Sequence, residues 1–263
     1  MIHNRQERIE ALGRVIDTLE ILRVKCPWDA KQTNESLRPN TIEEVYELSD
    51  ALMHAETDSA SLCKELGDVL LHILFYSKIA DEQGRFDIAD VADALNRKLI
   101  FRHPHVFGEV KADDAEQVAD NWEKIKLREK GGNRTVLSGV PKALPSLIKA
   151  FRIQEKAAHV GFDWQEPEQV WDKVAEEAGE VRQAISGGDK SQIESEFGDL
   201  LFAVVNAARL YGVNPDTALE HTNAKFMRRF AHIEEVAAAQ GRSVTDLSLD
   251  EMEAAWQQAK TEE

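Results

Sequence analysis

Residues 43–71 read EEVYELSDALMHAETDSASLCKELGDVLL, and the spacing of their acidic residues indicates two paired helices. Glu44 and Glu47 are three residues apart, as are Glu65 and Asp68, so each pair lies on one face of a helix. A short turn near residues 56–60 makes the two helices antiparallel neighbours. All four carboxylates are therefore expected to point into one gap between the helices.

The same pattern returns in the second half of the chain. Four segments have a counterpart there, in the same order and at offsets between 127 and 134 residues. The pairs are EEVYE (43–47) with EEAGE (176–180), ELGDVLL (65–71) with EFGDLLF (196–202), NRK (96–98) and Arg102 with NAK (223–225) and Arg229, and WEKIK (122–126) with WQQAK (256–260). Chance similarity between helical surfaces would not preserve four polar signatures in order, so the chain is an internal repeat.

Helical periodicity dominates the rest of the sequence and predicts an all-α fold. We expect a first domain at 1–130, a linker rich in Gly and Pro at 131–145, and a second domain at 146–263. Asp87 is expected to cap a helix, Pro167 and Pro215 to occupy first helical positions, and Ser248 with Glu251 to form a capping box. Helices are expected at 4–24, 41–56, 59–83, 87–101, 114–130, 146–159, 167–186, 189–211, 215–240 and 248–261.

Composition narrows the classes of partner. The 263 residues include 32 Lys and Arg and 48 Asp and Glu, a net charge of −16, which argues against direct binding to nucleic acid or to an anionic membrane. No apolar run approaches the roughly 20 residues of a membrane span, and no signal-peptide pattern opens the sequence. Two cysteines make no disulfide framework. A cytoplasmic protein is expected.

The acidic residues sit where isolated carboxylates would be costly. Asp68 precedes Val69 and Asp199 precedes Leu200, so both head strongly apolar helical segments. Like charges there repel one another and lose hydration unless a positive group joins them. A hard divalent cation with oxygen ligands meets this need, and Mg²⁺ also bridges to substrate phosphates. A di-iron bundle would require a Glu-x-x-His spacing, which the sequence does not contain.

Basic residues repeat as well. Lys225 and Arg229 are four residues apart on one helix face, as are Lys98 and Arg102. Beside a Mg²⁺ site they suit phosphate oxygens, whereas the alternative is an exposed basic stripe that forms ion pairs within its own helix.

Two further differences favour the second half as the nucleotide site. Lys173 lies one helical turn before Glu177, where the first half has Asn40. Trp122 and Trp256 each precede a lysine by four residues, and we expect packing for Trp122 and stacking on a base for Trp256.

These motifs resemble the MazG family of nucleoside triphosphate pyrophosphohydrolases, in the all-α NTP pyrophosphatase superfamily, whose signature is EExxE, a spacer and ExxD. Three more segments are similar to family motifs: CPWDAKQT (26–33), HPHVF (103–107) and VGFDW (160–164). The resemblance spans about residues 8–260, in the two-domain bacterial form. It implies two MazG-like helical domains of the four-helix-bundle type, completed by homodimerisation.

The resemblance also implies an activity, the Mg²⁺-dependent hydrolysis of a nucleoside triphosphate to the monophosphate and pyrophosphate. Carboxylates holding the metal would orient a water molecule for in-line attack on the α-phosphorus. Glu176 or its counterpart Glu43 can act as the general base for that water. The implied catalytic residues are Glu176, Glu177 and Glu180. The implied metal ligands are Glu177, Glu180, Glu196 and Asp199, and the implied substrate ligands are Lys173, Lys225, Arg229, Trp256 and Lys260. A second candidate site comprises Glu44, Glu47, Glu65, Asp68, Lys98, Arg102 and Trp122.

Substrate breadth rests on a weaker pattern. No cluster of Asn and Gln that would recognise one base edge is evident, so ribo- and deoxyribonucleoside triphosphates of any base are expected to be accepted. Two alternatives stay open: a dUTPase- or dCTPase-like enzyme confined to one pyrimidine, and a non-catalytic helical protein that regulates a partner.

Overall fold

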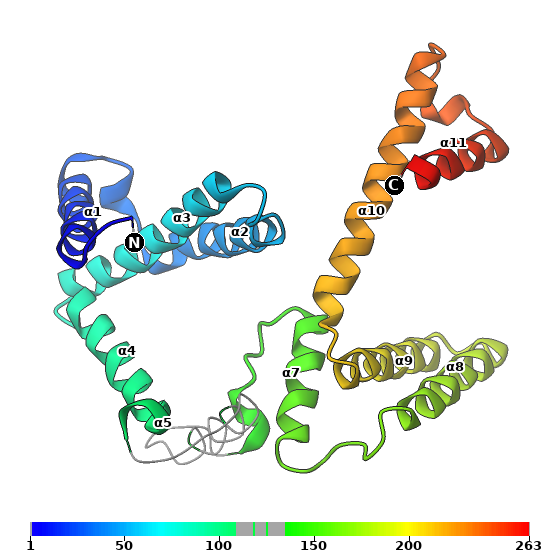
Figure 1. Ribbon diagram of the computed structural model, residues 1–263, viewed down its shortest axis with the longest axis horizontal. Helices are drawn as coiled ribbons and strands as arrows, with labels where there is room; N and C mark the ends of the chain where they lie inside the picture. Colours follow the sequence, from blue (N-terminus) through cyan, green and yellow to red (C-terminus); the bar gives the residue numbers. More distant parts are fainter. Residues whose placement is uncertain (1, 109–117, 119–124, 126–134, 263) are drawn as a thin grey trace. The chain divides into compact units, whose positions relative to one another are not determined.

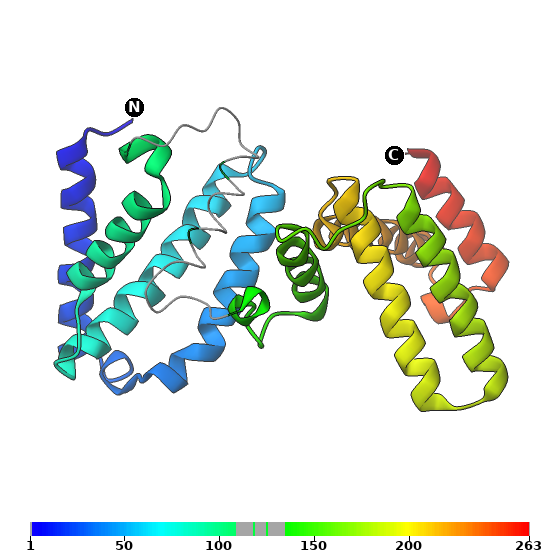
Figure 2. The same cartoon turned by 90° about the horizontal axis from the view of Figure 1, so that it is seen from below.

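The computed structural model describes residues 2–108, 118, 125 and 135–262, and every regular element in these ranges is helical (Figures 1 and 2). The fold class is therefore all-α, as the sequence predicts. The chain divides into two units, Met1–Lys111 and Ala112–Glu263, which are described separately below. The predicted boundary at 130 and the linker at 131–145 fall partly outside the described residues and stay predictions.

The N-terminal unit is built around a helical hairpin. Helices α2 (Asn34–Met53) and α3 (Ser59–Glu82) lie side by side, joined by a short turn (Figures 1 and 2). Helices α1 (Arg5–Lys25) and α4 (Ile88–Arg102) pack against α3, and η1 (Asp29–Lys31) and α5 (Pro104–Phe107) complete the unit. The buried core of Leu19, Leu37, Leu74, Phe75 and Ile79 joins α1, α2 and α3.

The C-terminal unit contains a second hairpin. Helices α8 (Gln169–Gly187) and α9 (Lys190–Leu210) meet at Gly188, whose φ of 76° is the left-handed conformation that glycine adopts without strain. Helix α7 (Ser146–Ala158) packs on α9, and the buried Gln154 Nε2 donates to the Phe202 carbonyl at 2.8 Å. A turn, η2 (Val136–Gly139), precedes α7. This hairpin repeats the α2–α3 arrangement.

The end of the chain forms a third packed pair. Helix α10 (Pro215–Ala239) holds α11 (Leu249–Glu262) through a small core of Ile233, Ala237, Leu247 and Ala255, with η3 (Val244–Asp246) between them. The predicted capping box is present, since Ser248 N–H donates to Glu251 at 2.7 Å and Glu251 N–H donates to Ser248 Oγ at 3.3 Å.

Most predicted helix boundaries hold within two residues, with one large exception. Helix α2 begins at Asn34 and not at residue 41, because Thr33 and Ser36 form a capping box and the helix continues through Pro39. Pro167 also lies outside α8, which begins at Gln169, whereas Asp87 and Pro215 occupy the predicted positions. The predicted helix at 114–130 lies outside the described residues except for positions 118 and 125.

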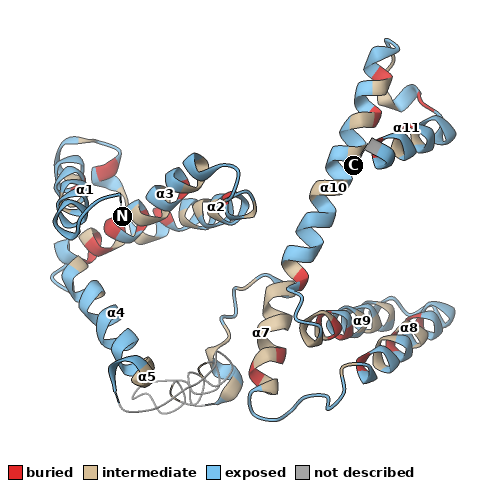
Figure 3. Ribbon diagram, in the orientation of Figure 1, coloured by how far each residue is buried: buried red, intermediate tan, exposed pale blue. Residues whose placement is uncertain are grey.

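Most buried residues lie on narrow stripes of the helices, and Leu247 in the connection before α11 is also buried (Figure 3). Both hairpins leave large apolar side chains exposed, including Tyr46, Leu66, Phe197 and Leu201 at 55%, 52%, 46% and 61%. Among the described residues, no helix combines the length and the apolar character that a membrane span requires.

Candidate metal and nucleotide site

The α8–α9 hairpin brings three of the four predicted acidic ligands together. One carboxylate oxygen from each of Glu177, Glu196 and Asp199 lies within 4.8 Å of the others. The fourth predicted ligand, Glu180, is close enough to this group to feel its charge. Partial loss of hydration, and then repulsion from Glu177 and Glu196, raise the pKa of the Glu180 carboxyl above its ordinary value. The spacing of three residues within each motif thus places these acids on facing sides of the two helices.

Glu177 is the buried member of the group, only 5% exposed. Its Oε1 atom pairs with Lys173 Nζ at 2.7 Å, and Lys173 also bonds Glu176 Oε1 at 2.9 Å. These two carboxylates raise the pKa of the Lys173 ammonium, Glu177 contributing most. The Glu177 Oε2 atom is buried without any hydrogen-bond partner, and a buried charged oxygen of this kind is costly unless a cation binds it.

The α2–α3 hairpin holds the second acidic group. One oxygen from each of Glu44, Glu47 and Glu65 lies within 4.8 Å of the others. Desolvation, followed by repulsion from Asp68, raises the pKa of the Glu44 carboxyl, which places Asp68 beside the group. A pocket of about 400 Å³, lined in part by Glu47, Glu65 and Tyr46, opens next to it.

In this second group the buried carboxylate is Glu65, 7% exposed. Lys64 Nζ pairs with Glu65 Oε1 at 2.8 Å and with Asp68 Oδ2 at 3.4 Å. Glu65 Oε2 is buried without a partner, as Glu177 Oε2 is in the other hairpin. Oxygen-only ligand sets with an unsatisfied buried carboxylate fit a hard divalent cation such as Mg²⁺ in both groups.

Apart from Lys173 on α8, the predicted substrate residues lie on α10 and α11. The Arg229 guanidinium lies 5.5 Å from the centre of the Trp256 ring, and Phe226 packs on the same ring at 5.1 Å. Trp256 is half-buried against the α10–α11 core, so it packs in this structure, while Lys260 is exposed at the end of α11. Lys225 is half-buried on α10. The structure brings Arg229 and Trp256 together and places Lys225 and Lys260 on the same two packed helices. Contact of these residues with the acidic group stays a prediction.

The predicted basic residues of the first half, Lys98 and Arg102, both lie on α4. Lys98 is exposed and Arg102 half-buried on α4. Trp122 lies outside the described residues.

The N-terminal hairpin also contains a polar network that was not predicted. Thr41 Oγ1 lies 2.9 Å from His72 Nδ1 and 2.5 Å from the Tyr76 hydroxyl. Burial lowers the pKa of the His72 imidazole, and the Asp68 carboxylate opposes this shift. The signal was present in the sequence, since His72 interrupts an apolar stretch four residues after Asp68.

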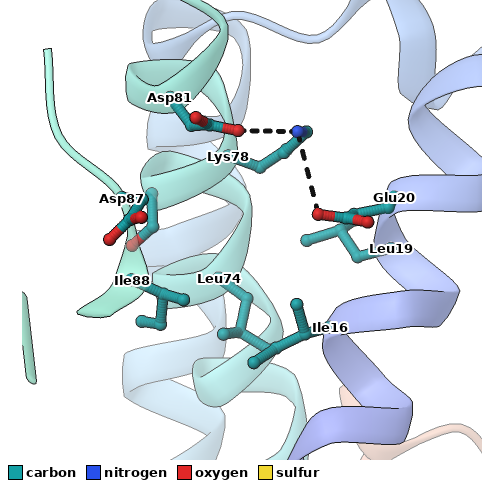
Figure 4. A pocket seen from close by; sticks show the side chains of 9 residues that line it. Ile16, Leu19, Glu20, Leu74, Lys78, Asp81, Asp87 and Ile88 are labelled. Carbon is teal, nitrogen blue, oxygen red and sulfur yellow. Dashed lines mark hydrogen bonds and ion pairs between the residues drawn. The ribbon is translucent and has the colours of Figure 1, made fainter. Parts of the chain in front are cut away.

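A further pocket of about 120 Å³ lies among α1, α3 and α4 (Figure 4). Lys78 Nζ reaches Asp81 Oδ2 at 2.7 Å and Glu20 Oε1 at 3.9 Å on one side of it, and Ile16, Leu74 and Ile88 line another side. In the described residues, groups of three or more side chains suited to one metal ion occur only in the two hairpins.

Comparisons with known proteins identify the family of this chain. The model of the MazG nucleotide pyrophosphohydrolase domain matches residues 32–107 and 165–234, which include both acidic groups and together exceed half of the chain. A protein of Escherichia coli K12 named nucleoside triphosphate pyrophosphohydrolase is 42% identical over 262 residues, covering 97% of this chain and 98% of that protein. The nucleoside triphosphate pyrophosphohydrolase/pyrophosphatase MazG of Thermotoga maritima is 44% identical over 236 residues, 89% of each chain. With two matched segments, each holding one acidic hairpin, this chain belongs to the MazG nucleotide pyrophosphohydrolase family.

Proposed function

We propose that the protein hydrolyses nucleoside triphosphates to nucleoside monophosphates and pyrophosphate in a Mg²⁺-dependent reaction at the α8–α9 hairpin. The observation that carries this proposal is the buried Glu177 Oε2 atom, which has no partner and belongs to a group of three carboxylates within 4.8 Å. The names of the relatives from E. coli and T. maritima support the substrate class.

The acidic residues would act as metal ligands. Glu177, Glu180, Glu196 and Asp199 would hold Mg²⁺, which supplies Lewis-acid polarisation of a phosphoryl oxygen when bound. Metal binding requires these carboxylates to be ionised. Because the pKa of Glu180 is raised, this residue loses its proton, and becomes available to the metal, at a higher pH than an ordinary glutamate does.

Glu176 and Lys173 would complete the chemistry on α8. The Glu176 side chain is 57% exposed beside the group, so it is accessible to a water, whose proton it would accept as the water oxygen bonds to the α-phosphorus. The bond from that phosphorus to the bridging oxygen breaks, and pyrophosphate leaves. Lys173 Nζ, already beside Glu177, would donate to the triphosphate and neutralise part of its charge.

The cluster on α10 and α11 would bind the remainder of the nucleotide. Lys225 and Arg229 are proposed to contact phosphate oxygens, and Trp256 and Lys260 to close over the nucleoside. We propose that a homodimer completes the site, which is supported by exposed apolar side chains such as Phe197 and Leu201 on α9 and Met227 on α10.

An assay of pyrophosphate release from all eight common ribo- and deoxyribonucleoside triphosphates tests the proposal. We expect turnover of several bases, loss of turnover with EDTA and recovery with Mg²⁺. Turnover of a single pyrimidine nucleotide would contradict the broad specificity. The absence of metal-dependent release from every nucleotide would contradict the enzymatic role and favour a regulatory binding protein.

A further inference from the structure

Lys64 occupies an unusual position in the N-terminal acidic group. It immediately precedes Glu65 on α3, and its ammonium lies 2.8 Å from Glu65 Oε1 and 3.4 Å from Asp68 Oδ2. Both partners come from the ExxD motif, and Glu65 is one of the three acids whose oxygens lie within 4.8 Å of one another. The Lys64 ammonium therefore already pairs with one of the carboxylates that could hold a metal. The Lys64 side chain is itself 66% exposed. It can therefore move into solvent without disturbing the core.

The C-terminal group has no lysine at the position equivalent to Lys64. The repeat aligns Lys64 with Ser195, an exposed residue that carries no charge. The lysine of that group, Lys173, lies on the other helix and pairs with Glu176 and Glu177. Within the described residues, neither Glu196 nor Asp199 forms an ion pair, so the carboxylate oxygens of the second ExxD motif are available to another cation.

The N-terminal group nevertheless retains the character of a cation site. Glu65 Oε2 is buried and lacks a hydrogen-bond partner even though Lys64 holds the other oxygen of the same carboxylate. Glu44, Glu47 and Glu65 still present oxygens within 4.8 Å of one another. The lysine therefore satisfies this group only in part.

We propose that Lys64 is an internal competitor of the divalent cation at the N-terminal acidic group, and that it lowers the metal affinity of this group. The inference rests on the proposed metal chemistry of the acidic hairpins. Two physical effects act in the same direction. The ammonium occupies oxygens of Glu65 and Asp68 that a metal would use, and its charge repels a divalent ion bound a few ångströms away. In a near-aqueous environment this repulsion alone amounts to about tenfold in affinity.

The matched substitution is Lys64→Ser, which installs the residue found at the repeat position. Exposed ion pairs contribute little to stability, so the fold is expected to be preserved. Lys78→Ser is the control, because Lys78 is also on α3 and also bonds two carboxylates, Asp81 and Glu20, but lines the pocket of Figure 4 and not the acidic group. It removes the same charge from the same helix.

Mn²⁺ binding to the full chain, followed by the electron paramagnetic resonance signal of free Mn²⁺, measures the effect. The background variant carries Glu180→Gln and Asp199→Asn, which remove the exposed ligands of the α8–α9 group. Mn²⁺ binding that is lost when Glu65→Gln is added is then assigned to the N-terminal group. In this background Lys64→Ser should tighten the Mn²⁺ Kd about tenfold, and Lys78→Ser should leave it unchanged.

Three results would overturn the inference: an unchanged or weaker Kd with Lys64→Ser, an equal gain with Lys78→Ser, or no Glu65-dependent Mn²⁺ binding in any variant. Pyrophosphate release by the unmodified protein is measured in parallel. Because that reaction is assigned to the α8–α9 group, the absence of pyrophosphate release from the unmodified protein would count against the proposed function and not against the role of Lys64.

Discussion

The α2–α3 and α8–α9 hairpins share one motif pair but bury different members of it. In α2–α3 the buried acid is Glu65, from the ExxD motif on the second helix. In α8–α9 it is Glu177, from the EExxE motif on the first helix. Each buried glutamate pairs through one oxygen with a lysine of its own helix and keeps the other oxygen without a partner.

The position of the lysine determines which acidic motif of each hairpin keeps carboxylate oxygens that are not paired with it. In the N-terminal hairpin Lys64 covers ExxD, whereas in the C-terminal hairpin Lys173 sits against EExxE and leaves Glu196 half-buried and Asp199 exposed. A lysine at the first motif can serve both a carboxylate and an incoming phosphate. A repeated sequence motif therefore does not guarantee a repeated site, because one cation placed on the other helix changes which oxygens remain for a metal.

The interiors of the hairpins differ as well. The network of Thr41, His72 and Tyr76 lies in the first hairpin, and the repeat aligns these residues with Val174, Ala203 and Ala207. The C-terminal hairpin thus has small apolar residues where the N-terminal one has hydrogen-bonded polar groups.

The largest expected effect separates the two acidic groups. Glu180→Ala should abolish turnover, a loss of at least about 100-fold in kcat, because it removes a proposed metal ligand. Glu47→Ala at the matching position should retain most of the turnover. Pyrophosphate release by the two purified variants measures this, and equal losses would show that catalysis is not confined to the C-terminal half.

A smaller effect is expected from exchanging the lysine of α8 for its repeat counterpart. Lys173→Asn should lower kcat/KM by roughly 10- to 100-fold, since a hydrogen bond to a charged group contributes about 1.5–3 kcal/mol. Steady-state kinetics with one nucleoside triphosphate give the value, and Lys78→Asn controls for the lost charge. Unchanged kcat/KM for Lys173→Asn would remove this residue from substrate binding.

The smallest effect concerns stability of the N-terminal hairpin. Tyr76→Phe should lower the free energy of unfolding by about 1 kcal/mol, because the Tyr76 hydroxyl bonds Thr41 inside the network. Tyr46→Phe, at an exposed position of α2, should change it by less than about 0.5 kcal/mol. Urea unfolding followed by circular dichroism compares the two variants. Identical midpoints would mean that the network does not stabilise the hairpin.

Much of the architecture followed from local patterns. Apolar periodicity and capping residues such as Asp87 and Ser248 act within a few residues of the chain, so the all-α class and most helix ends were predictable. The start of α2 was not predicted, because the capping box of Thr33 and Ser36 begins the helix upstream of Pro39, which lies inside it. The motif spacing likewise anticipated that acids from neighbouring helices would meet.

The sequence by itself determined that the chain is a duplicated helical protein with an acidic motif pair in each half, because periodicity, spacing and repetition are properties of residue order. Only the tertiary structure decided that Glu65 is buried in one half and Glu177 in the other, and that Lys64 bridges two acids. Burial and ion pairing depend on how each helix is rotated against its neighbour. That rotation is set by the whole packed interface, so it cannot be predicted from the motif residues alone.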